Sequence, residues 1–133
     1  MSHNNAYSQY KENSVFTASP EELTLMLYNG LVKFIMQAQK SIEDKDLPKA
    51  HSSIIRALDI ITEFRVTLDR KYEISQNLDM MYDYMNRRLI DANLKKDKEI
   101  LEEVLYFAKE LRDTWAQAMK LAKKQPGNQA AAR

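Results

Sequence analysis

Residues 17–36 read Thr-Ala-Ser-Pro-Glu-Glu-Leu-Thr-Leu-Met-Leu-Tyr-Asn-Gly-Leu-Val-Lys-Phe-Ile-Met, and this stretch decides the fold. It opens with a helix start signal, because Ser19 can cap free backbone N–H groups, Pro20 suits the first helical position and Glu22 completes a capping box. Two apolar stripes follow at helical spacing: Leu23, Leu27, Leu31, Phe34 and Ala38, and then Leu25, Val32 and Met36. A helix with one solvent face needs a single stripe. We therefore expect this helix to be covered on two sides, by its own chain or by a partner.

The composition is that of one domain built from a few long helices. The chain has 133 residues, of which 44% are hydrophobic and 29% are charged, as in ordinary globular proteins. A chain of this length can bury a core of its own. Because it contains only two glycines and three prolines, few tight turns can form, and long helices are favoured over a sheet.

The charge balance and the lack of cysteine exclude several classes of function. Twenty basic and nineteen acidic residues give a net charge of +1, so no attraction to nucleic acid or to an anionic membrane is expected. The chain has no cysteine, which excludes disulfides and thiolate chemistry and suits a reducing cytosol. The N-terminus is polar and no apolar run approaches the ~20 residues of a membrane span, so neither a signal peptide nor membrane insertion is expected.

Hydrophobic spacing predicts four helices. The first covers about residues 20–44, and the second, capped by Asp46, covers about 46–70. After a break at 72–75 a third helix follows, and Asp97 can cap the fourth. The expected core positions of the last three helices are Ala50, Ile54, Ala57, Leu58, Ile61, Phe64 and Leu68; Leu78, Met81, Tyr82, Met85, Leu89 and Ala92; and Leu101, Val104, Ala108, Leu111, Trp115, Ala118 and Ala122.

Short connections between long helices make neighbouring helices antiparallel. The sequence therefore predicts an all-α fold, an antiparallel up-and-down four-helix bundle over residues 17–124. Trp115 is expected on its inner seam. Residues 1–16 are expected to be a flexible N-terminal arm that can form a short extra helix, and residues 125–133 a disordered tail.

The chain lacks the residue sets that catalysis in a helical bundle requires. A di-metal site needs Glu-x-x-His pairs, but His3 lies in the polar leader and the residue three before His51 is Pro48. Gly30 and Gly127 are too far apart to form a phosphate-binding loop, and no base is placed to activate a serine or threonine. We therefore predict that the protein is not an enzyme and uses no cofactor and no metal.

The helices carry more apolar surface than one core needs. The second helix has an additional stripe of Ile55, Thr62 and Val66, interrupted by Asp59. The third has Met80, Tyr84 and Leu94 on a face shared with Arg87 and Asp91. Three explanations are open: scattered surface residues, a homodimer interface, or a groove that receives an amphipathic helix from a partner.

The N-terminal leader and one glycine favour the groove. Tyr7 and Tyr10 are amphipathic anchors in the leader, and such an arm can lie over the groove until a partner displaces it. Gly30 inside the first helix costs about 1 kcal/mol relative to alanine, so a helix, the arm or a ligand is expected to pack closely there. The candidate partner-binding residues are Tyr7, Tyr10, Leu25, Val32, Met36, Ile55, Thr62, Val66, Met80, Tyr84 and Arg87.

Several separated motifs give the chain a family resemblance. They are Thr17-Ala-Ser-Pro-Glu-Glu-Leu, Met26-Leu-Tyr-Asn-Gly, Asn77-Leu-x-x-Met-Tyr-Asp-Tyr-Met-Asn-Arg-Arg-Leu, Ala92-Asn and Leu111-Arg-Asp-Thr-Trp, in order over about residues 5–120. The chain resembles the bacterial flagellar secretion chaperones that serve flagellin. It departs from many of them at Asn29, where Asp is expected.

The resemblance implies a cytosolic helical bundle that binds the C-terminal region of flagellin, prevents premature polymerisation and delivers flagellin to the flagellar type III export apparatus. The implied partners are thus flagellin and components of the export gate. Separately, the additional apolar stripes leave a homodimer of the free protein open. The alternative is a helical homodimeric adaptor without chaperone activity, whose second stripes are buried between two copies. Sedimentation of the protein alone and with a flagellin C-terminal peptide distinguishes the two.

Overall fold

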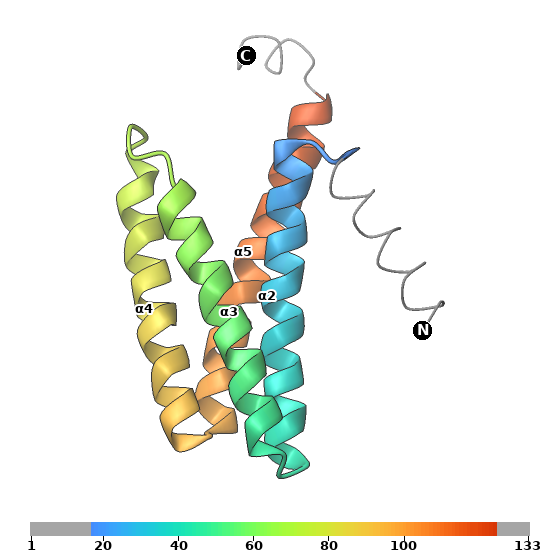
Figure 1. Cartoon of the computed structure of the whole chain (residues 1–133). Helices are drawn as coiled ribbons and strands as arrows, with labels where there is room; N and C mark the ends of the chain where they lie inside the picture. Colours follow the sequence, from blue (N-terminus) through green and yellow to red (C-terminus); the bar gives the residue numbers. More distant parts are fainter. Residues whose placement is uncertain (1–16, 125–133) are drawn as a thin grey trace.

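The computed structural model describes residues 17–124, which form four α-helices that run alternately in opposite directions (Figure 1). Their bounds are α2 Pro20–Glu43, α3 Leu47–Thr67, α4 Ile74–Lys95 and α5 Lys98–Lys124. Each helix packs against the next one in the chain, and α5 packs against α2 to close the ring. The predicted all-α four-helix bundle is confirmed. The expected arm and tail, residues 1–16 and 125–133, lie outside the described part of the chain.

Polar side chains fix the starts of three helices, as the sequence predicts. Ser19, Asp46 and Asp97 accept hydrogen bonds from backbone N–H groups two or three residues later, at 3.2, 3.2 and 2.8 Å. The second helix ends at Thr67, three residues before its predicted end. It ends there because Leu68 is extended, and Asp69 then accepts a bond from the backbone N–H of Lys71 at 3.1 Å, which forms a local turn.

The buried face of α2 is wider than a single stripe. Its centre is formed by positions that are almost fully buried: Tyr28, Leu31, Ile35 and Ala38. On one flank, the guanidinium of Arg56 in α3 lies 5.6 Å from the ring centre of Phe34. On the other flank, Gln39 donates a hydrogen bond to Glu102 of α5 at 2.7 Å. Leu31 and Ala38 of the first predicted stripe and Val32 of the second are all buried, so the two stripes are parts of one wide face.

Gly30 of α2 lies against α3. A methyl group at this position would meet the Cδ1 atom of Ile60 at 3.4 Å. A neighbouring helix, one of the three predicted explanations for a glycine inside the helix, therefore contacts this position.

The bundle is closed at one end and open at the other (Figure 1). At the closed end, where α2 meets α3 and α4 meets α5, Ala38, Ala50 and Ala92 are fully buried. At the open end, α3 and α4 diverge from α2 and α5, and burial is less complete: Ser75 is buried, but Leu78 is only half-buried and Ile74 is 62% accessible.

The predicted inner seam of α5 is only partly correct. Leu111 and Trp115 are half-buried against the core, but Ala118 and Ala122 are exposed. The helical repeat directs all four side chains toward the bundle axis. Because the helices diverge, no other helix of residues 17–124 buries the last two. Trp115 instead donates its indole N–H to the backbone carbonyl of Glu21 in α2, at 3.0 Å.

Candidate functional site

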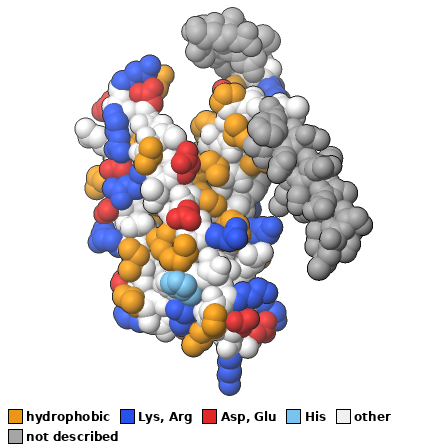
Figure 2. Space-filling model, in the orientation of Figure 1, with side chains coloured by type: hydrophobic (Ala, Val, Ile, Leu, Met, Phe, Trp, Pro, Cys, Tyr) orange, Lys and Arg blue, Asp and Glu red, His pale blue; other side chains and the backbone are white. Residues whose placement is uncertain are grey.

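Large apolar side chains are exposed on the sides of α3 and α4 that face away from the core. Val66 is 75% exposed, Met80 70% and Leu94 80%. Figure 2 shows hydrophobic side chains, in orange, gathered in patches on this face of the molecule. Side chains as exposed as these contribute little to the stability of the free bundle.

These residues and their neighbours form one candidate surface. On α3, Ile55, Thr62 and Val66 are exposed at helical spacing, and on α4 Met80, Arg87 and Leu94 recur every seven residues. We call this set of six residues the outer face. Five of them are predicted site residues, and Leu94 extends the set.

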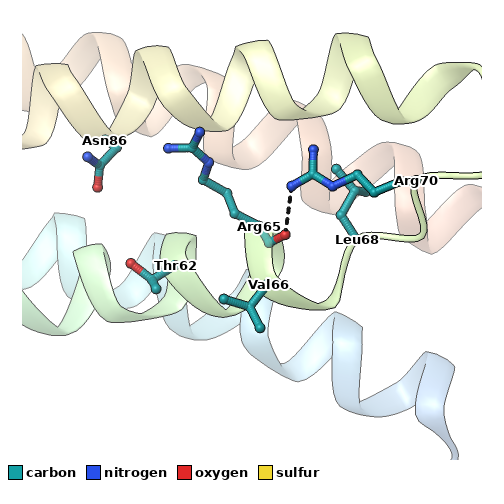
Figure 3. Close-up of a pocket in the computed structure, with 6 residues that line it drawn as sticks. All are labelled: Thr62, Arg65, Val66, Leu68, Arg70 and Asn86. Carbon is teal, nitrogen blue, oxygen red and sulfur yellow. Dashed lines mark hydrogen bonds between the residues drawn. The ribbon is translucent and has the colours of Figure 1, made fainter.

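A pocket of about 470 Å³ lies between α3 and α4 at the open end of the outer face (Figure 3). Its lining comes from α3, from the following loop and from α4: Thr62, Arg65, Val66, Leu68, Arg70 and Asn86. Thr62 and Val66 are predicted site residues, whereas the other four were missed.

Ion pairs hold the wall of this pocket. Arg65 contacts Asp79 of α4 at 3.1 Å and Asp83 at 3.4 Å. Arg70 pairs with Asp79 at 3.4 Å and donates to the backbone carbonyl of Arg65 at 3.1 Å, the bond dashed in Figure 3. Hydrogen bonds from Arg65 and then Arg70 hold the pKa of Asp79 below its usual value. These pairs connect α3 to α4 and fix the shape of the opening.

A signal for the missed residues exists in the sequence. In an antiparallel hairpin, the end of α3 lies beside the start of α4, so Arg65 and Arg70 are placed opposite Asp79 and Asp83. Opposite charges at such matching positions indicate a cross-link between helices. Apolar spacing alone does not detect it.

Tyr84 belongs to a different part of the surface from the outer face. Its hydroxyl donates to Glu103 of α5 at 2.9 Å, and its ring meets Phe107 edge-on at 6.0 Å. The hydrogen bond to Glu103 raises the pKa of the Tyr84 phenol. Arg87 lies over the Tyr84 ring at 5.8 Å and pairs with Asp83 at 3.1 Å. Tyr84 therefore faces the seam between α4 and α5.

The predicted site residues of α2 lie on yet another side. Val32 is 5% exposed and belongs to the core, Leu25 is half-buried and Met36 is half-exposed. Val32 lies seven residues before Gln39, which contacts α5, so this stripe faces α5. The expectation that Val32 offers a surface to a partner does not fit its burial. Tyr7 and Tyr10 lie outside the described residues.

Over residues 17–124, no group of histidine and carboxylate side chains could hold a metal ion. His51 is exposed, and its Nδ1 lies 2.9 Å from the side-chain nitrogen of Asn93. No helix in this same range is both long and apolar enough to cross a bilayer.

Comparison with known proteins places these observations in a family. Residues 3–122 match the family model described as "Flagellar protein FliS". The flagellar secretion chaperone FliS of Bacillus subtilis (strain 168) is 46% identical over 93% of this chain and 93% of its own length. The flagellar secretion chaperone FliS of Escherichia coli (strain K12) is 35% identical, over 86% of this chain and 87% of its own. That of Salmonella typhimurium (strain LT2) is 34% identical, over 84% and 86%.

Proposed function

This chain belongs to the flagellar protein FliS family, a family of flagellar export chaperones and not of enzymes, and we propose that its client is the C-terminal segment of flagellin. It covers the apolar faces of that segment before export, prevents premature polymerisation, and delivers flagellin to the flagellar type III export apparatus. Its partners are accordingly flagellin and the components of the export gate, and it acts in the cytoplasm.

The observation that carries this proposal is the outer face. Three large side chains there are at least 70% exposed, and no neighbouring helix covers them. Burial of apolar surface gains roughly 25 cal/mol per Å², so an amphipathic helix laid along α3 and α4 would gain from contacts that the free protein does not make. This is the helix-in-groove mode of recognition.

The pocket provides an anchor point for such a helix. Val66 and Leu68 give it an apolar lining, while Thr62 and Asn86 can form hydrogen bonds at its wall. One apolar side chain of the client would enter between α3 and α4. Because the ion pairs of Arg65 already neutralise the nearby carboxylates, the pocket presents little net charge to an incoming apolar group.

The client must make an extended contact with the chaperone, because its segment is unfolded before it binds. A segment that folds only on binding loses conformational freedom, at a cost of about 2–5 kcal/mol. An extended apolar contact along two helices offsets this cost, whereas a single small pocket would not. No nucleotide is required, since the export apparatus can drive release.

The N-terminal arm would regulate this site. We propose that Tyr7 and Tyr10 cover part of the client surface in the free protein and are displaced by flagellin. An arm that competes lowers the apparent affinity by the fraction of time it occupies the site. Deletion of residues 1–12 is therefore expected to tighten flagellin binding in calorimetry, and the double variant Tyr7→Ala/Tyr10→Ala to do the same. Weaker binding would mean that the arm clamps the client instead.

Sedimentation and calorimetry test the client directly. A peptide of the flagellin C-terminal region is expected to bind the intact chain with one well-defined stoichiometry, with a negative heat-capacity change from apolar burial. A flagellin N-terminal peptide serves as the control and is expected not to bind. A free protein that sediments as a stable dimer and binds neither peptide would support the homodimeric adaptor.

A further inference from the structure

Three aromatic side chains meet inside the bundle, one from each of three helices. Tyr28 of α2, Phe64 of α3 and Tyr82 of α4 are at most 6% exposed. The ring centres of Tyr28 and Phe64 are 4.4 Å apart, and those of Phe64 and Tyr82 are 5.5 Å apart. We call these three residues the aromatic cluster.

A hydrogen bond crosses the bundle within this cluster. The hydroxyl oxygens of Tyr28 and Tyr82 are 2.8 Å apart and buried. Burial raises the pKa of both phenols, so both remain protonated and one donates to the other. Because α2 and α4 occupy opposite corners of the ring of helices, this bond connects elements that are not sequential neighbours.

The cluster lies at the border between two differently packed halves. From Tyr82 toward the closed end, the inward positions Met85, Leu89 and Ala92 are fully buried. From Tyr82 toward the open end, Leu78 is half-buried, Ser75 is buried and Ile74 is mostly exposed. Among the described residues, the cluster is thus the last layer of large buried apolar side chains.

Beyond the cluster, the helices are tied in two pairs. The ion pairs of Arg65 and Arg70 join the end of α3 to the start of α4. The indole N–H of Trp115 joins α5 to the start of α2. Both ties run within a pair, and Figure 1 shows the two pairs leaning apart at this end.

We propose that the aromatic cluster is the pivot of a hinge built into the fold. The α3/α4 pair and the α2/α5 pair separate at the open end, while the alanine-lined closed end stays together. The bond between Tyr28 and Tyr82 limits the opening. Separation uncovers inward apolar surface at Leu78, Leu111 and Trp115. The hinge goes beyond the proposed client, because it belongs to the free protein.

Removal of one hydroxyl tests the pivot. Tyr28→Phe keeps the ring but leaves the hydroxyl of Tyr82 buried without a partner, which favours states in which it reaches water. Loss of one net hydrogen bond changes the ratio of open to closed molecules roughly five-fold. The double variant Tyr28→Phe/Tyr82→Phe also loses the bond but leaves no unpartnered hydroxyl, so a smaller opening is expected.

Spin labels on pairs of introduced cysteines measure the opening, since the natural chain has no cysteine to interfere. Labels at Glu22→Cys and Gln76→Cys report the distance between α2 and α4 at the open end. Labels at Lys40→Cys and Lys95→Cys report the distance between the same two helices at the closed end. All four side chains are exposed. Distance distributions are then recorded by pulsed electron spin resonance.

The hinge predicts a broad distribution at the open end and a narrow one at the closed end. It also predicts that Tyr28→Phe raises the long-distance population at the open end roughly five-fold and leaves the closed end unchanged. Equally narrow distributions at both ends, or equal broadening at both ends in the variant, would overturn the inference. If Tyr28→Phe does not fold, the double variant is compared with the natural chain instead, with a smaller increase expected at the open end and no change at the closed end.

Discussion

The two ends of the bundle differ in the size of the side chains between their helices. At the closed end, Ala38, Ala50 and Ala92 let the backbones approach closely. Toward the open end, Tyr28 and Phe64 take the corresponding inward positions. Because the distance between helix axes follows the side chains at the contact, small residues close one end and aromatic rings hold the other apart. The two ends of one bundle are thus packed differently, with small residues between the helices at one end and aromatic rings toward the other.

Truncation in the closed half is expected to have the largest effect on stability. Leu89 is fully buried, so Leu89→Ala loses its apolar contacts and leaves a cavity, which costs about 2–5 kcal/mol. The matched control is Leu94→Ala on the same helix, where the side chain is 80% exposed and the expected change stays within about 0.5 kcal/mol. Urea unfolding measures both. Equal losses would remove the distinction between core and outer face.

Truncation in the open half is expected to cost less. If Trp115 on the predicted inner seam were fully buried, its replacement by alanine would cost about 3–5 kcal/mol of unfolding free energy. Its side chain is half-exposed. We therefore expect Trp115→Ala to lower the free energy of unfolding by roughly 2 kcal/mol. Trp115→Phe keeps most of the packing and loses the bond to the carbonyl of Glu21, for about 1 kcal/mol. A loss as large as that of Leu89→Ala would show that the open end is as well packed as the closed end.

Acid is expected to weaken the bundle through ion pairs that connect its helices, those of Asp79 in the open half and that of Glu103 in the closed half. Arg65 and then Arg70 lower the pKa of Asp79, and Arg88, with a smaller contribution from Tyr84, lowers that of Glu103. A carboxyl group with a lowered folded-state pKa contributes stability above its unfolded pKa and loses it as the pH falls through the folded value. Stability should thus hold from pH 7 to about 5 and decline below about pH 4.

The variant Asp79→Asn checks the origin of this decline. It removes one of the two carboxylates, so its stability at pH 7 is slightly lower and its loss in acid is shallower. Urea midpoints at pH 7, 4 and 3 compare the two proteins. Parallel curves would mean that the pairs of Asp79 do not contribute. High salt is expected to reduce the difference, because these side chains are accessible to solvent.

Local chemistry made much of the fold predictable from the sequence. Ser19, Asp46 and Asp97 mark helix starts because their side chains satisfy free N–H groups nearby. The buried stripes of α3 and α4 follow from three- and four-residue spacing. The location of Val32 did not follow, because spacing gives the direction of a side chain around its own helix but not which helix lies there.

The candidate site shows the same limit. Val66 and Met80 could be found, since they are apolar and lie off the core stripes of their helices. The pocket required knowledge of the register between α3 and α4, which sets Arg65 opposite Asp79. The divergence of the helices at the open end depends on packing between helices far apart in the sequence. Apolar spacing therefore placed Ala118 and Ala122 in a core that does not extend that far.

Substitutions on the outer face are expected to change stability least. They also give the most direct test of the central claim, which is that this face binds the client. Val66→Gln is compared with Leu121→Gln, an exposed apolar position near the end of α5. Both variants should unfold within about 0.5 kcal/mol of the natural protein. Titration with the flagellin C-terminal peptide should show roughly tenfold weaker binding for Val66→Gln, from the lost burial of one valine, and unchanged binding for Leu121→Gln. Unchanged affinity in Val66→Gln, or an equal loss in both variants, would contradict the account.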